Sequence, residues 1–78
     1  MSAQYRLVVA KKEERVEGAD DASIVFSVPV AVAVADGFDA TVEYMRGKLK
    51  ATGHTGRVLD LLKTGEVDAA FARLVAGL

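Results

Sequence analysis

The sequence has no cysteine, no tryptophan, a single proline and a single histidine, His54. Without cysteine, neither a disulfide framework nor a thiolate metal site can form. One histidine also excludes a histidine-rich metal site. We therefore expect no metal and no cofactor.

The chain also lacks an excess of either charge and lacks long apolar runs. Ten lysines and arginines nearly balance eleven aspartates and glutamates, which leaves a net charge of −1. This balance argues against a nucleic acid or an anionic membrane as the partner. The first residues, MSAQYR, have no apolar signal core, and no apolar run approaches the ~18 residues of a membrane span. We expect one cytoplasmic domain over residues 1–78, without stable membrane insertion.

Apolar residues alternate with polar ones in the first half of the chain. Residues 4–11 place Tyr5, Leu7 and Val9 on one face, and residues 23–30 repeat the pattern. A period of two is typical of a half-buried strand. Both segments are therefore predicted to be strands.

The segments beside these strands are less regular. Residues 11–15, KKEER, mix both signs of charge, and we expect a solvated turn or a strand edge there. Residues 18–21 carry a turn signal. Residues 29–37, PVAVAVADG, are ambiguous, because the valine alternation favours a strand whereas Pro29 and Gly37 suit the start and the stop of a helix.

The helical period begins at Phe38. Asp39 is a suitable N-cap and Gly47 a suitable residue just past the helix end. Residues 48–52 alternate again, with Leu49 directed inward and both lysines outward, which fits a short edge strand.

Two more helices are predicted after this edge strand. The first is capped by His54 or Thr55 and ended by Gly65, and the second covers residues 67–76. Their apolar stripes are Val58, Leu61 and Leu62 in the first, and Val67, Ala70, Phe71, Leu74 and Leu78 in the second. Strands followed by helices, without regular βαβ alternation, predict an α+β fold: a small, mostly antiparallel sheet of three to four strands packed against three to four helices.

No set of residues has the spacing of a catalytic site. Asp20 and Asp21 are adjacent, so on a strand they would point to opposite faces. His54 has no neighbouring base and orienting residue. The run Gly53 to Arg57 could cradle an anion at a helix start, but the Lys-Ser/Thr of a phosphate loop is missing. We expect a protein that is not an enzyme.

Residues 44–54, YMRGKLKATGH, are similar to a sequence motif of a known protein family, and the similarity extends over residues 23–62. This half of the chain resembles the sterol carrier protein type 2 family of lipid-binding domains, in a short form that lacks the family's N-terminal helix and first strand. His54 stands where the family has an aspartate. The resemblance implies a strand–helix–helix–strand order, a helix within residues 29–37, and an apolar tunnel for a fatty acid, an acyl-CoA, a sterol or a phospholipid.

The resemblance makes the buried apolar residues candidates for the lining of a lipid cavity. An empty pocket of ~300 Å³ would cost roughly 7 kcal/mol, so it must be filled by ligand, collapsed into a core, or completed by a second subunit. Taken residue by residue, plain core packing is favoured over a ligand contact for each candidate. The alternative is a ligand-free interaction or dimerisation module, such as a homodimer, that uses Val8 or Val25 on the opposite sheet face. The candidate lining residues are Phe26, Val28, Val30, Phe38, Val42, Met45, Leu49, Leu61, Leu62, Phe71 and Leu74.

Overall fold

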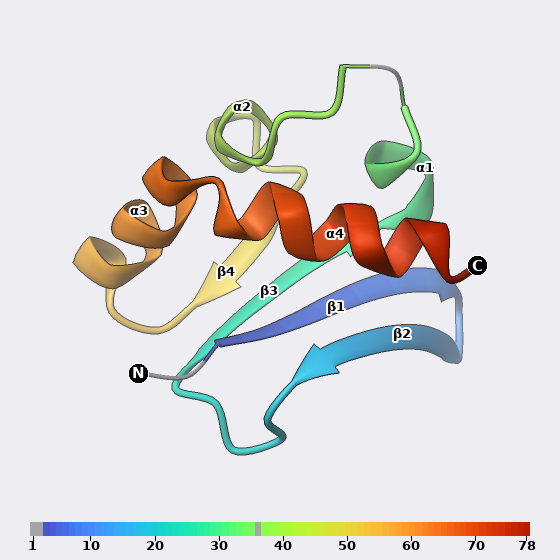
Figure 1. The fold of residues 1–78 in the computed structure, drawn as a ribbon, viewed down its shortest axis with the longest axis horizontal. Helices are drawn as coiled ribbons and strands as arrows, with labels where there is room; N and C mark the ends of the chain where they lie inside the picture. Colours follow the sequence, from blue (N-terminus) through green and yellow to red (C-terminus); the bar gives the residue numbers. More distant parts are fainter. Residues whose placement is uncertain (1–2, 36) are drawn as a thin grey trace.

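The computed structural model describes residues 3–35 and 37–78. Within them, the chain forms a four-stranded mixed sheet and four helices (Figure 1). The strands are β1 (Ala3–Ala10), β2 (Glu13–Gly18), β3 (Ile24–Pro29) and β4 (Lys50–Thr52), and the helices are α1 (Val30–Ala33), α2 (Ala40–Met45), α3 (Thr55–Thr64) and α4 (Glu66–Ala76). The predicted α+β class and the predicted numbers of strands and helices are confirmed.

The sheet has the order β2-β1-β3-β4. β1 pairs with β2 and β3 with β4 in antiparallel fashion, whereas the central pair, β1 and β3, is parallel. The two strands with clean apolar alternation occupy the centre, and the two charged segments occupy the edges. Charged residues are common on edge strands because they discourage pairing with other chains. The sheet is therefore mostly antiparallel, as predicted, with a parallel centre that the alternation does not reveal.

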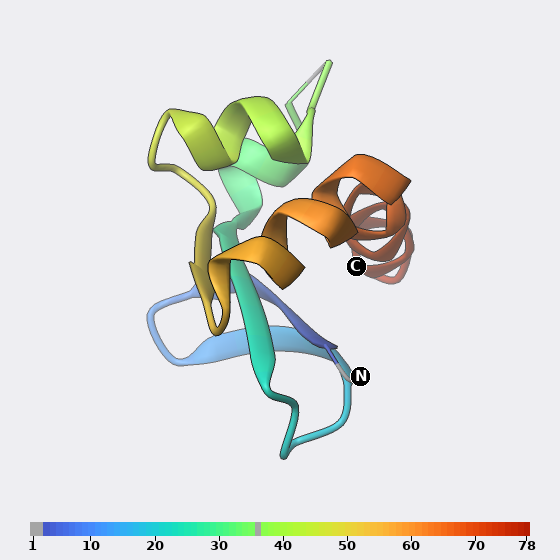
Figure 2. The same cartoon turned by 90° about the vertical axis from the view of Figure 1, so that its left-hand side faces the viewer.

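One face of the sheet carries the core. Its buried residues include Tyr5 and Leu7 on β1 and Phe26 on β3, each 5 % exposed or less. Helix α4 packs across β1 and β2, and α1 packs on β1 and β3. In Figure 2, α3 and α4 lie on the same side of β3.

Four aromatic rings connect the sheet to the linker between α1 and α2. Tyr5 stacks on Phe26 with ring centres 5.5 Å apart, and Phe71 of α4 meets Tyr5 edge-on at 5.8 Å. Phe38, between α1 and α2, meets Phe71 edge-on at 6.2 Å. Edge-to-face contacts at these separations are favourable beyond the area that they bury.

The capping predictions for the middle of the chain are confirmed except at Gly37. Residues 30–33 form a helix that starts directly after Pro29, as the resemblance implies, but it ends with Val34 as its C-cap, so Gly37 does not stop it; Asp36 lies outside the described residues. The carboxylate of Asp39 accepts hydrogen bonds from the backbone N–H groups of Thr41 and Val42. Gly47 then takes a φ of 79°, a left-handed conformation that suits the residue after a helix end.

One further detail differs from the sequence prediction. Leu78 was expected on the buried stripe but is 53 % exposed, because α4 ends at Ala76. Of the two predicted caps of α3, His54 occupies the N-cap position, and its side chain makes no capping hydrogen bond. The predicted edge strand forms over Lys50–Thr52, and Leu49, just before it, is buried while both lysines are exposed.

Candidate functional site

The predicted lining residues fall into three groups in the structure. Phe26, Val28, Leu49, Leu62 and Phe71 belong to the fully buried core, with exposed fractions of 4 % or less. Val30, Phe38, Leu61 and Leu74 are partly buried against that core. Val42 and Met45 lie at the surface, 42 % and 78 % exposed, because the six-residue helix α2 buries Ala40 instead. Most of these side chains therefore contact one another as a core and do not surround a common hollow.

Two open hollows lie beside α1 and share Phe38. The first, of about 560 Å³, adjoins α2 and contains charges of both signs. It is lined by Ala31, Val32, Ala35, Gly37, Phe38, Asp39, Val42, Glu43, Arg46 and Lys48. The second, of about 510 Å³, lies between α1 and α4 and is mostly apolar. It is lined by Ala33, Val34, Phe38, Asp68, Ala72, Val75 and Ala76, and we call it the α1–α4 groove.

Helix α4 supplies one wall of the α1–α4 groove with a face of its own. Asp68, Ala72 and Ala76 are four residues apart, so they lie along one side of the helix. The core-facing residues of α4, such as Phe71, lie on another side. The alanines leave the hollow open because they have little side chain to fill it. The sequence analysis missed this face, although the i, i+4, i+8 repeat of small residues beside the core stripe is a signal for it.

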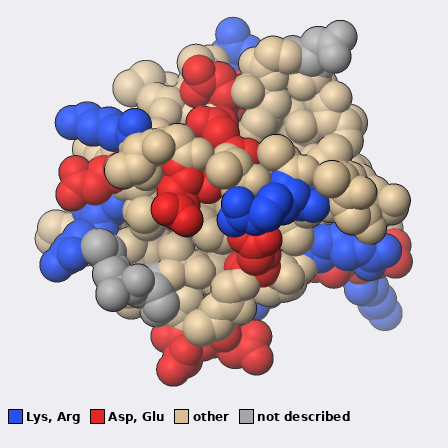
Figure 3. Space-filling model, viewed as in Figure 1, with Lys and Arg blue, Asp and Glu red and all other residues tan. Residues whose placement is uncertain are grey.

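The α1–α4 groove opens onto a surface with few charges. Figure 3 shows mostly tan surface over α1 and over the C-terminal end of α4, at the right of the view, beside a blue side chain that lies across the helix. Val34, at the end of α1, is 51 % exposed and contributes apolar area there.

Asp68 is the charged member of the described groove lining. One oxygen of its half-buried carboxylate accepts a hydrogen bond of 2.7 Å from the backbone N–H of Ala40. Asp39 accepts hydrogen bonds from the backbone N–H groups of Thr41 and Val42 at 3.0 and 3.3 Å. Two carboxylates therefore accept hydrogen bonds from the start of α2. Among the described residues, the carboxylate of Asp68 makes no other hydrogen bond or ion pair. Its second oxygen is therefore free to accept from a bound molecule.

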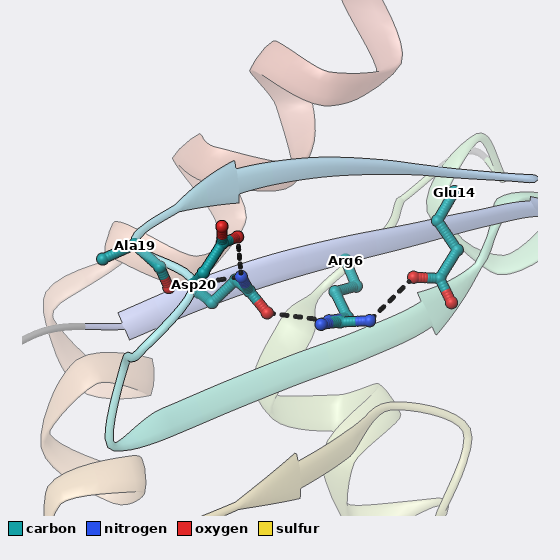
Figure 4. A network of polar contacts seen from close by, with 5 residues as sticks. Arg6, Glu14, Ala19 and Asp20 are labelled. Carbon is teal, nitrogen blue, oxygen red and sulfur yellow. Dashed lines mark hydrogen bonds and ion pairs between the residues drawn. The ribbon is translucent and has the colours of Figure 1, made fainter.

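The opposite face of the sheet carries an ordered polar network (Figure 4). Gln4, which is 1 % exposed, donates from Nε2 to the Ala19 carbonyl and to the Asp20 carboxylate, at 3.2 and 3.4 Å. Arg6 donates to the Gln4 amide oxygen at 2.7 Å and to Glu14 at 3.1 Å. This face is thus held mainly by polar contacts.

A charged pair holds α4 to the edge strand β2. Arg73 donates two hydrogen bonds, of 3.0 and 2.5 Å, to the carboxylate of Glu17. The hydrogen bond from Arg73 holds the pKa of Glu17 below its ordinary value. Burial, followed by the charges of Glu66 and Glu17, raises the pKa of Tyr5. These groups fix the orientation of the helix that forms the groove wall.

The start of α3 has a smaller hollow, of about 300 Å³, lined by Ser23, Ile24, His54 and Arg57. It adjoins the glycine-containing run that the sequence offered as an anion cradle. No group of three His, Asp or Glu side chains within residues 3–35 and 37–78 is arranged to hold a metal ion.

Comparisons of the chain with protein-family models, with curated proteins and with solved structures found no match. None of the helices in the described part of the chain has the length and apolar character needed to cross a bilayer. The α1–α4 groove, with its apolar walls and its one carboxylate, is the candidate functional site.

Proposed function

We propose that the protein is a non-catalytic, cytoplasmic lipid-binding protein that holds the apolar part of its ligand in the α1–α4 groove. The observation that carries this proposal is the lining of the groove: apart from Asp68, its described residues are all apolar. Small-molecule sites have volumes of about 300–1,000 Å³ and mostly apolar walls with a few polar groups. The groove, at about 510 Å³, falls within this range.

The open shape of the groove favours weak, exchangeable binding. Ten methylene groups, fully buried, would contribute about 8 kcal/mol. Association costs at least about 4 kcal/mol, and an open groove buries a chain only in part. The net gain is then at most about 4 kcal/mol, so we expect a dissociation constant of about 1 mM or weaker for a simple alkyl ligand. Such an affinity suits a protein that takes up and releases a lipid.

The order of elements around the groove also supports the proposal. β3, α1, α2 and β4 follow one another in the strand–helix–helix–strand order that the resemblance to sterol carrier domains implies. We propose that the chain is a relative of those domains that uses a surface groove beside α1 in place of their tunnel.

The test is to fill the groove from α4. Ala72→Phe places a ring among the groove lining, whereas Ala69→Phe places the same ring on an exposed position of the same helix. Binding of 1-decanol, measured by isothermal titration calorimetry, should fall at least about ten-fold in Ala72→Phe and stay unchanged in Ala69→Phe. Equal binding by both variants would refute the groove as the site.

A second candidate function is an interaction or dimerisation module that uses the opposite sheet face. It is favoured by Val16, which is 44 % exposed there, with Val8 and Val25 partly exposed on the same face. Against it stands the network of Arg6 and Glu14, because burying such an ion pair costs desolvation that its attraction does not fully repay. The lipid-binding function is therefore preferred.

A further inference from the structure

We propose that the α1–α4 groove selects amphiphiles with a cationic, ammonium-type head group, and that Asp68 recognises this head group. The inference rests on the proposed function, because it concerns the ligand of the same groove. It goes further by excluding anionic lipids, such as free fatty acids, as the preferred ligands.

The inference rests on the negative charge in the groove lining. Asp68 is the charged residue among the described groove lining, and the neighbouring wall residues Ala72 and Val34 are apolar. A carboxylate partly removed from water attracts an ammonium group and repels a second carboxylate more strongly than it would in open solvent. A neutral alcohol can donate one hydrogen bond to the carboxylate, but it carries no opposite charge, so its interaction is the weaker one.

The second oxygen of Asp68 is available for this role. The hydrogen bond from Ala40 occupies one oxygen and holds the carboxylate in place at 2.7 Å. An ionised carboxylate has about four acceptor positions, so an ammonium group can be accepted in addition to the backbone N–H. The head group would then be bound by an acceptor whose orientation is already fixed, which reduces the entropy that binding must overcome.

The start of α2 does not cancel this negative charge. A helix start carries at most about half of a positive elementary charge, and α2 has only six residues. Two full carboxylates, Asp39 and Asp68, face this start. The local charge beside the groove therefore remains negative.

The position of Asp68 also sets the orientation of the ligand. Asp68 is in the first turn of α4, and Ala76 is its last residue, eight positions further on. At 1.5 Å per residue, the two lie about 12 Å apart along the helix axis. The head group would sit beside the start of α2, and the alkyl chain would run along Ala72 toward Ala76.

Three probes with one alkyl chain test the selectivity: decylammonium, 1-decanol and decanoate, each kept below its aggregation concentration at pH 7. A primary amine is charged at this pH, as lysine is. Calorimetry should give decylammonium the highest affinity and decanoate the lowest.

Asp68→Asn is the decisive variant. Asparagine keeps an oxygen that can accept from the Ala40 N–H but removes the charge. We expect decylammonium binding to fall about ten-fold or more and 1-decanol binding to fall clearly less, so that the ratio of decylammonium to 1-decanol affinity decreases. Glu66→Gln is the matched control, because it removes an equal charge two residues away from a position that is exposed and outside the groove lining. It should leave the ratio of decylammonium to 1-decanol affinity unchanged.

The outcomes separate this inference from the proposed function. If 1-decanol binds and Ala72→Phe blocks it, but Asp68→Asn leaves the ratio of decylammonium to 1-decanol affinity as it was, the head-group inference is overturned and the groove function stands. An equal fall in this ratio in Glu66→Gln would overturn it as well, because the effect would then come from net charge. Absence of binding by all three probes would overturn both.

Discussion

Phe71→Leu should destabilise the protein strongly, because Phe71 joins the sheet to the groove. Its side chain is 0 % exposed. Its ring meets Tyr5 of β1 at 5.8 Å and Phe38 of the groove lining at 6.2 Å. Leucine removes three buried carbon atoms and both ring contacts, and it leaves space that the neighbouring residues can only partly fill.

The expected loss is a large part of the total stability. At about 0.8 kcal/mol per buried carbon, the three missing carbons account for roughly 2 kcal/mol, and the two lost ring pairs together add roughly 1–3 kcal/mol. A domain of 78 residues has a free energy of unfolding of roughly 4–12 kcal/mol. A loss of about 3–5 kcal/mol should lower Tm by roughly 12–40 °C.

Urea denaturation followed by circular dichroism measures this loss. Leu78→Ala is the control, because Leu78 is 53 % exposed and its truncation should cost less than about 0.5 kcal/mol. If Phe71→Leu cost no more than Leu78→Ala, the account of a core built on linked aromatic rings would be wrong.

Two further predictions concern a turn and a charged pair. Gly53 has a φ of 115°, and an added Cβ would lie 2.7 Å from the Ser23 carbonyl oxygen, so Gly53→Ala should cost about 1–3 kcal/mol in urea denaturation. Gly37→Ala, where φ is 74° and the space is open, should cost clearly less; equal costs would show that the close contact is unimportant. Glu17→Gln should lower Tm at pH 7. Because the pKa of Glu17 is lowered in the folded state, its stabilisation is present above the ordinary value of 4.5 and is lost as the pH falls through the folded-state pKa. The Tm difference between Glu17→Gln and the wild type should therefore shrink as the pH is lowered below 4.5, and a difference that did not depend on pH would contradict the pairing with Arg73.

The strands could be predicted wherever one face of the strand is buried and the other is exposed to solvent. This condition holds for β1 and β3, so their alternation is clean. It fails for β2, whose residues are almost all exposed, and residues 11–15 therefore indicated only a turn or a strand edge. The parallel pairing of β1 with β3 is set by contacts between segments far apart in the chain, and a local pattern does not contain this information.

The helix ends were predictable because their signals are local. Asp39 caps α2 with its own side chain, and Gly65 ends α3 in a left-handed conformation, as expected from residue type alone. The exposure of Met45 was not predictable in this way. Its spacing from Phe38 and Val42 fits a buried stripe, but α2 is too short to present one.

The candidate site was predicted only in part. Phe38 was proposed as a lining residue and does border both hollows. The other members of the α1–α4 groove are small or polar, and apolar periodicity selects large residues that fill the core. Asp68 in particular looks like an ordinary first-turn acid until the structure brings α2 beside it.

Native mass spectrometry of the gently purified protein, followed by organic extraction, tests the central claim most directly. The account predicts a monomer that takes up a single added alkyl ligand, and it predicts that Ala72→Phe loses this adduct. A clean dimer without ligand would support the sheet-face module instead. A monomer that binds nothing, even with excess 1-decanol, would contradict the lipid-binding function.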